Sequence, residues 1–139
     1  MTMSSEQSEA QSAAEWSVEI PYNLVSPNRV MRMHYRTRAK EAEKVYNLLW
    51  CYGRPFVQFD CPVRVHIVRE WGKRQRAMDE DNLYGSCKML IDALKKPKGR
   101  SRRGLSIILD DDPSVVSLKV EQRKNDEGLS KVIVKVFPS

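Results

Sequence analysis

Alternation of apolar and polar residues predicts four short β-strands along this chain. Trp16, Val18 and Ile20 alternate with Ser17 and Glu19, and Pro21 ends the pattern. The same period recurs in three later segments, which contain Val63, Val65 and Ile67, then Val116, Leu118 and Val120, and finally Val132, Val134 and Val136. Because a period of two turns one side of each strand inward, we expect these side chains to line a common core.

Two other segments show helical spacing. From about Thr37 to Tyr52 the apolar residues recur every three or four positions, and Gly53 follows as a stop signal. A second helix is predicted from the acidic stretch at 79–81 to about Lys96, with an apolar stripe of Leu83, Cys87, Leu90, Ile91 and Leu94. Between the first strand and the first helix, PYNLVSPNRVMRMHYR is predicted to be a loop.

The order strand, helix, strand, helix, strand, strand predicts a small α+β fold with one sheet and two helices. RKNDEG, residues 123–128, separates the last two strands and is typical of a hairpin turn. Residues 1–15 are polar and lack an apolar stretch, so we expect a disordered tail, followed by one domain over residues 16–139.

Charge and cysteine content narrow the class of protein. Residues 16–139 hold 24 Lys or Arg against 15 Asp or Glu, which favours a polyanionic partner such as nucleic acid over an uncharged one. Three cysteines without a CxxC pair are typical of reduced thiols, and no apolar run approaches the roughly 20 residues of a membrane helix. We therefore expect a cytoplasmic protein that does not enter a membrane.

An acidic cluster stands out in this basic chain. MDEDNLYGSCKMLIDAL, residues 78–94, places Asp79, Glu80 and Asp81 at the start of the second helix. Acids there are favoured by the helix dipole and by capping, and Lys88 and Asp92 have the spacing of an ordinary helical ion pair. A second cluster at Asp110–Asp112 ends an apolar segment. If the two clusters meet, their carboxylates suit Mg²⁺, which uses a few carboxylate oxygens together with water and phosphate.

These residues together resemble the RusA family of Holliday junction resolvases. The resemblance rests on Asp79-x-Asp81-Asn82-Leu83, on Lys88-x-x-x-Asp92-Ala93-Leu94, and on Asp111-Asp112 before Val115-Val116, and it covers roughly residues 17–137. It implies a homodimer with a mixed four-stranded sheet and two α-helices. It also implies a Mg²⁺-dependent endodeoxyribonuclease, with Mn²⁺ as an alternative ion, that acts on four-way DNA junctions in recombination and repair in a bacterial or phage-infected cell.

The resemblance assigns roles to individual residues. Asp79, Asp81 and Asp112 correspond to the metal-binding acids, Asp111 to a neighbouring acid of the pattern, and Lys88 to the catalytic lysine. In the better-known members the lysine follows the second aspartate by four residues, whereas here it follows by seven. Both spacings return to a similar side of a helix.

Basic residues on either side of this helix are expected to contact DNA phosphates independently of sequence. They are Lys73, Arg74, Arg76, Lys95, Lys96, Lys98, Arg100, Arg102 and Arg103. Trp71 and Tyr84 are candidates for stacking on unpaired bases, with core packing as the alternative. Two other functions remain open from the sequence, a branched-DNA-binding protein that does not cut and a Mg²⁺-dependent flap or single-strand nuclease.

Overall fold

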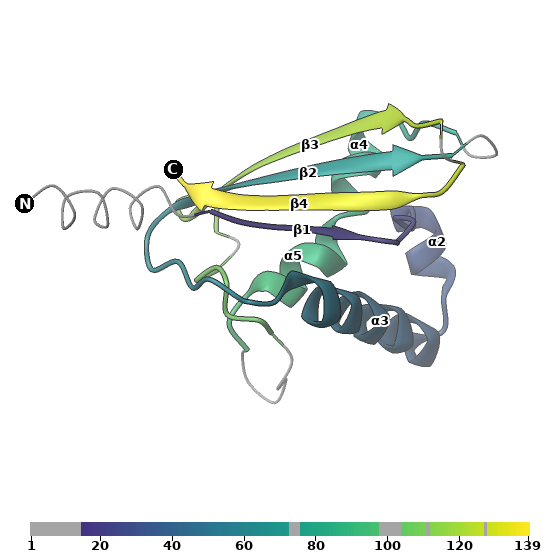
Figure 1. The fold of residues 1–139 in the computed structure, drawn as a ribbon. Helices are drawn as coiled ribbons and strands as arrows, with labels where there is room; N and C mark the ends of the chain where they lie inside the picture. Colours follow the sequence, from purple (N-terminus) through teal and green to yellow (C-terminus); the bar gives the residue numbers. More distant parts are fainter. Residues whose placement is uncertain (1–14, 73–75, 98–103, 111, 127) are drawn as a thin grey trace, which may run out of the picture.

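The structure is a computed structural model that describes residues 15–72, 76–97, 104–110, 112–126 and 128–139. Four strands form one sheet in the order β1-β4-β2-β3, and helices lie against one of its faces (Figure 1). The strands are β1 (Trp16–Ile20), β2 (Val63–Trp71), β3 (Val116–Lys124) and β4 (Lys131–Pro138). The predicted α+β class and all four predicted strands are therefore confirmed. The tail predicted at 1–15 lies outside the described residues, apart from Glu15.

The sheet is mixed, because β2 pairs in parallel with β3 but antiparallel with β4, which also pairs antiparallel with β1. The predicted hairpin between the last two strands is wrong, since β3 and β4 lie on opposite sides of β2. RKNDEG is a turn signal, and a turn signal indicates that the chain reverses but not which strand becomes its neighbour. The chain continues the β2–β3 pairing as far as Asn125, whose backbone N–H donates to the carbonyl of Trp71 at 3.0 Å.

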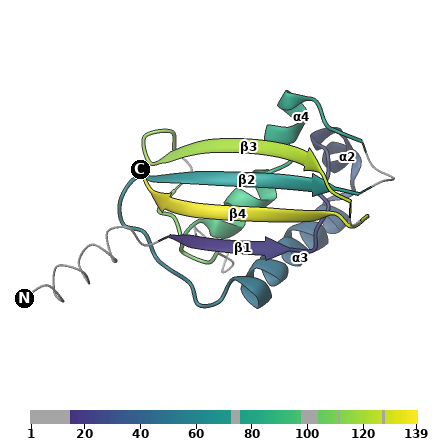
Figure 2. The same ribbon diagram turned by 45° about the horizontal axis from the view of Figure 1, so that its top comes forward.

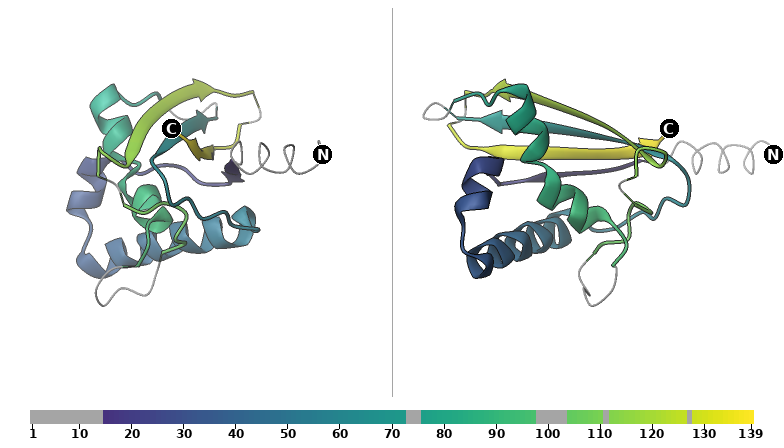
Figure 3. Two further views of the ribbon diagram at one scale, coloured as in Figure 1. Left: turned by 90° about the vertical axis from the view of Figure 1, so that its left-hand side faces the viewer. Right: turned by 180° about the vertical axis from the view of Figure 1, so that it is seen from behind.

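The hydrophobic core lies between the sheet and the helices. The inward side chains of β1 are at most 5% exposed, and Val132, Val134 and Val136 of β4 are fully buried. Figures 2 and 3 show that the helices cover only this face. The opposite face carries charged and polar residues such as His66, whose Nε2 lies 2.9 Å from Oε2 of Glu121. The alternation in the sequence thus separates a packed face from a solvated one.

Helix α3 (Tyr35–Gly53) forms the floor of the core (Figure 1). Its buried residues Val45, Leu49 and Gly53 recur every four positions and pack toward β1 and α5. A Cβ atom at Gly53 would lie 2.6 Å from the Trp16 ring, and the Gly53 carbonyl accepts a hydrogen bond from Trp16 Nε1 at 2.7 Å. Gly53 therefore lets the indole approach the helix, and the helix predicted at 37–52 is confirmed with a start at Tyr35.

Helix α2 (Pro27–Arg32) occupies part of the segment that the sequence predicts as a loop. Its start is specified locally, because Oγ of Ser26 accepts a hydrogen bond from the backbone N–H of Arg29 and Pro27 stands at the first helical position. None of its residues is buried, so it lacks the apolar stripe by which a longer helix is recognised.

The second predicted helix is interrupted, so the expected number of two helices is wrong. It consists of α4 (Glu80–Gly85) and α5 (Lys88–Leu94), separated by Ser86 and Cys87. At the interruption Ser86 Oγ donates to the carbonyl of Leu83 at 2.6 Å, and the Cys87 N–H bonds to Tyr84, three residues back. Such a three-residue hydrogen bond tightens the backbone locally, which offsets α5 from α4.

Candidate metal and nucleic-acid site

Asp79 is the N-cap residue of α4, yet its carboxylate makes no capping hydrogen bond. Its backbone is extended, and its carbonyl accepts the first helical bond from Leu83 N–H at 2.9 Å. Glu80 and Asp81 follow in the first turn, and all three acids are exposed. The helix dipole favours these acids, but the carboxylate of Asp79 is not used in closing the helix and stays accessible to a ligand.

The backbone directly before Asp79 is fixed by the side chain of Gln122 on β3. The Met78 N–H donates to Gln122 Oε1 at 3.0 Å, and Gln122 Nε2 donates back to the Met78 carbonyl. This reciprocal pair satisfies both backbone groups of one residue. It therefore ties the start of the acidic cluster to the sheet.

Arg69 on β2 completes this arrangement. Its Nη1 donates to Gln122 Oε1 and to the carbonyl of Arg76, both at 3.1 Å, and its guanidinium lies 5.5 Å from the centre of the Trp71 ring. The side chain is 3% exposed, and burial lowers its pKa from the ordinary value. We call Arg69, Gln122 and Met78 the amide clamp.

Sequence reasoning missed Arg69 and Gln122, although a signal exists for both. They are register partners on β2 and β3, and each continues the inward positions of its strand. A charged residue at an inward position requires buried hydrogen-bond partners. The alternation in β2 therefore predicts that Arg69 makes such bonds.

Lys88 begins α5 and is exposed. The ion pair that its spacing suggests with Asp92 is replaced, because Asp92 Oδ1 instead lies 3.2 Å from Lys95 Nζ. Lys88 and Asp92 line a cavity of about 290 Å³ together with Pro113 and Val116. Lys88 therefore shares this cavity with the segment that directly follows the second acidic cluster.

Asp112 is held in a tight turn before β3. Its Oδ1 accepts hydrogen bonds from the backbone N–H of Ser114 at 2.9 Å and from the Ser114 hydroxyl at 2.8 Å. These two bonds lower the pKa of Asp112 from its ordinary value. Asp112 is exposed, whereas Asp111 lies outside the described residues. One carboxylate oxygen of Asp112 is thus engaged in a turn that leads the chain into the sheet.

The structure separates the acids that the sequence predicts to share one ion. Asp79 follows Met78, which is bonded to Gln122 near the end of β3, while Asp112 precedes the start of β3 at Val116. Six residues of strand between Val116 and Gln122 span about 20 Å. Among the residues that the structure describes, no three His, Cys, Asp or Glu side chains are grouped to hold a metal ion. Asp79 thus follows a residue bonded near the end of β3, and Asp112 lies just before its start.

The predicted DNA contacts are placed only in part. Arg76 and Lys96 are exposed, while Lys95 is engaged with Asp92. The remaining six, Lys73, Arg74, Lys98, Arg100, Arg102 and Arg103, lie outside the described residues. Tyr84 packs against the core, and its hydroxyl accepts a hydrogen bond from Val120 N–H at 3.3 Å, so it serves packing.

Comparison of the sequence with models of known protein families and with curated proteins finds no match. In the part of the chain that the structure describes, no helix has the length and apolar character needed to cross a membrane.

Proposed function

We propose that this protein is a RusA-like, Mg²⁺-dependent endodeoxyribonuclease that acts on four-way DNA junctions as a homodimer. The observation that carries the proposal is the pair Asp79 and Asp81, two exposed carboxylates at a helix start whose backbone is fixed by the amide clamp. Mg²⁺ is commonly bound by one or two carboxylates together with water and substrate phosphate, so this donor set suits it.

In the proposed reaction, water attacks the phosphorus of a phosphodiester and the bond to the 3′ oxygen breaks. The products are a 3′-hydroxyl and a 5′-phosphate. Asp79 and Asp81 would hold the Mg²⁺, which would supply a polarised water and neutralise charge on the phosphate oxygens. Lys88 begins α5, after the break that follows α4, and its ammonium group stabilises the negative charge that grows on the leaving oxygen.

The decisive experiment is cleavage of a mobile synthetic four-way junction beside duplex, flap and single-strand controls, with Mg²⁺, with Mn²⁺ or with EDTA. The proposal expects paired cuts in the junction only when a metal ion is present, and none from Asp81→Asn. Preferred cutting of the flap or the single strand would favour the nuclease alternative that shares the site but not the substrate. Equal metal-dependent cutting by Asp81→Asn would contradict the assignment of the site.

A second candidate is a branched-DNA-binding protein that does not cut. It is favoured by the turn at Asp112, where one carboxylate oxygen bonds Ser114 and the residue is set apart from Asp79. Asp112→Asn tests whether Asp112 binds metal or only closes the turn, because asparagine keeps the acceptor oxygen for Ser114 and loses the charge. A three-acid metal site expects lost cleavage at an unchanged unfolding temperature. Retained cleavage would restrict the ion to Asp79 and Asp81.

A further inference from the structure

A groove of about 520 Å³ lies between α2, α3 and α5. We call it the helix groove. Apolar side chains of these helices form most of its lining, including Val30, Ala39, Ala42 and Met89. One wall is fixed by close packing, since a Cβ atom at Gly85 would lie 2.6 Å from Cγ of Pro27. The helix groove is thus a formed concavity with an apolar interior.

Arg38 and Lys88 are the cations among the groove's lining residues, and the chain around α2 and the start of α3 is basic. Residues 27–44 contain six Lys or Arg against two Glu, and Arg38 lines the groove itself. Burial and the hydrogen bond from Tyr22 to Glu41 raise the pKa of Tyr22, whereas Arg29 acts in the opposite direction. Lys44 Nζ lies 5.6 Å from the centre of the Tyr22 ring. Asp92, the acid in the lining, is paired with Lys95 at 3.2 Å. An apolar interior with a cationic rim suits a ligand that joins a flat apolar part to a negative charge.

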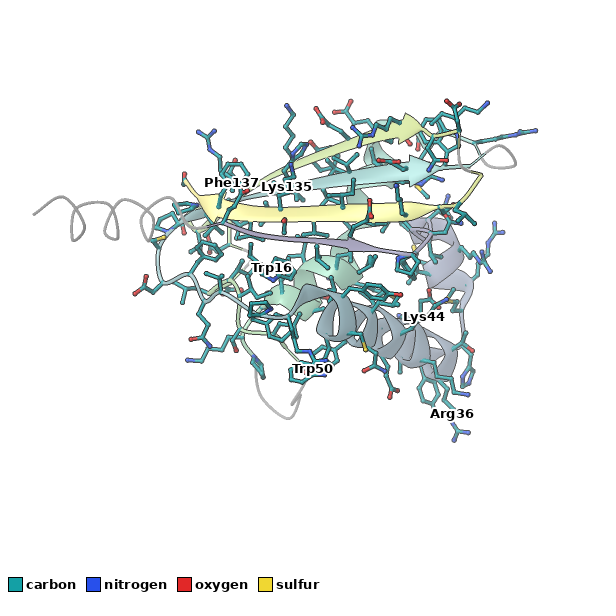
Figure 4. The ribbon with its side chains drawn as sticks, in the orientation of Figure 1. Trp16, Arg36, Lys44, Trp50, Lys135 and Phe137 are labelled. Atoms are coloured by element: carbon teal, nitrogen blue, oxygen red, sulfur yellow. The ribbon has the colours of Figure 1, made fainter. Side chains whose placement is uncertain are left out.

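An aromatic platform stands at the mouth. Tyr35 lines the groove and is 64% exposed, and its ring lies 4.4 Å from that of His34 between centroids. The guanidinium of Arg36 lies 5.8 Å from the Tyr35 centroid, and Figure 4 shows Arg36 at the start of α3, pointing away from the sheet. An exposed ring that lies beside a second ring and an arginine provides a surface for base stacking.

The groove also reaches the candidate active site. Lys88 and Asp92 line the helix groove on one side and the smaller cavity beside Pro113 on the other. A strand with a base in the groove therefore has its backbone within reach of the proposed catalytic lysine.

We propose that the helix groove binds an unpaired nucleotide of the DNA substrate, with its base on Tyr35 and against the apolar lining. The phosphates of that nucleotide contact Arg38 and Arg36. This inference rests on the proposed action on DNA, and it adds that the strand next to the scissile phosphate is unpaired when it is bound.

The test measures binding of the full chain in EDTA by fluorescence anisotropy. The probes are a short labelled oligothymidylate and an oligomer of equal length and charge made of abasic units. Stacking predicts that the wild type binds the thymidine probe about tenfold more tightly at equal salt. Tyr35→Ala and Ala39→Trp, which remove the platform and fill the groove, should bring this ratio close to one. Tyr52→Ala, an exposed tyrosine on α3 outside the groove, should preserve it.

Equal affinity of the wild type for both probes would overturn the inference, as would an unchanged ratio in Tyr35→Ala. Should the groove variants alter the oligomeric mass in solution and leave the ratio unchanged, the groove belongs to a second copy of the chain. Because the assay contains no metal, a failure of the nuclease proposal is detected separately, by the absence of cleavage with Mg²⁺.

Discussion

Three neighbouring carboxylates repel one another, and the side chain of Asp79 gains no capping bond in return. The helix dipole acts against this repulsion, because it favours acids in the first turn. In the proposed function, Asp79 and Asp81 would both be ligands of one divalent cation, which would remove this repulsion. Stability that depends on Mg²⁺ concentration is therefore the expected property of this pair.

We expect Mg²⁺ to raise the unfolding temperature of the wild type and to leave that of Asp79→Asn and Asp81→Asn unchanged. An ion that binds only the folded state stabilises it by RT ln(1 + c/Kd), where c is the free ion concentration, so the unfolding temperature rises with ion concentration. Differential scanning fluorimetry across a Mg²⁺ series measures the effect. Asp126→Asn, an exposed acid in the turn after β3, is the matched control and should respond like the wild type. An equal response in all variants would place the ion elsewhere.

Lys88→Ala should lose cleavage and keep Mg²⁺ affinity. The ammonium group acts on charge that develops in the transition state, and a cation beside acids does not help to hold a metal. Single-turnover cleavage of the junction and Mg²⁺ titration are the two measurements. Lys119→Ala, on the solvated face of the sheet, is the control for loss of one positive charge. Normal cutting by Lys88→Ala would remove this lysine from the site.

The sequence is enough to single out Asp79, Asp81 and Asp112 as candidate metal ligands, because clustered carboxylates are unusual in a basic chain. Their geometry is not encoded locally, since the distance between Asp79 and Asp112 depends on the length and direction of β3. The clamp residues Arg69 and Gln122 were missed because hydrogen bonds between distant residues leave no periodic mark. Only the charge at an inward position of β2 signals them.

The position of α4 depends on the amide clamp more than on its own packing, because Leu83 is its one buried residue. A helix of six residues is not stable by itself in water. The two hydrogen bonds between Met78 and Gln122 therefore set where the acidic turn begins.

Gln122→Leu should weaken Mg²⁺ binding while DNA binding in EDTA is kept. The substitution leaves the backbone groups of Met78 without partners, which costs about 1–3 kcal/mol of stability, and lets the acidic turn move. Mg²⁺ titration by calorimetry and urea unfolding measure the two effects. Gln58→Leu, at an exposed position, is the control. A stability loss at unchanged Mg²⁺ affinity would make the clamp purely structural.

The apolar pattern predicts the ends of helices and strands that pack into the core. It does not predict ends that are set by local hydrogen bonds. The start of α2 at Ser26-Pro27 was present as a capping signal, but the segment has too few apolar residues to be recognised. The break between α4 and α5 depends on Ser86, whose hydroxyl donates a hydrogen bond to the Leu83 carbonyl. The apolar residues continue with helical spacing across this break. A periodic pattern does not detect such competition for a carbonyl.

Across the whole sheet, one buried carboxylate joins three strands. Glu70 of β2 accepts hydrogen bonds from Arg123 of β3 at 2.6 and 3.0 Å, and its other oxygen lies 3.8 Å from Lys131 of β4. Arg123 and Lys131 are its register partners on the two sides. Burial favours the neutral acid, but the bonds from Arg123 and Asn125 outweigh it and lower the pKa of Glu70 below its ordinary value of 4.5.

A lowered pKa in the folded state makes stability depend on pH in one direction. The contribution of Glu70 is fully present above about pH 4.5 and is lost as the pH falls through the lower folded value. Glu70→Gln should therefore lower stability at neutral pH and flatten its decline below pH 4.5. Thermal unfolding between neutral and acidic pH measures both, with Glu15→Gln outside the sheet as the control. If the stability of the wild type and of Glu70→Gln declined in parallel below pH 4.5, the role assigned to Glu70 would be contradicted.

The order of the strands in the sheet is the part of the fold that is hardest to predict from the sequence. Alternation predicts each strand and its inward face, whereas the neighbours are chosen by long-range pairing. β4 lies between β1 and β2, so the last strand along the chain occupies an interior position and β3 is left at an edge. Local turn chemistry at 123–128 carries no information about this choice.

That interior position sets a time order for synthesis. While the ribosome is still adding residues 131–138, the first strand has no partner, because β1 pairs only with β4 among the described strands. The parallel β2–β3 pair needs no later residue, whereas the backbone groups of β1 gain their sheet partners only when β4 has been made. A chain that stops before residue 131 would thus lack the strand that joins β1 to β2.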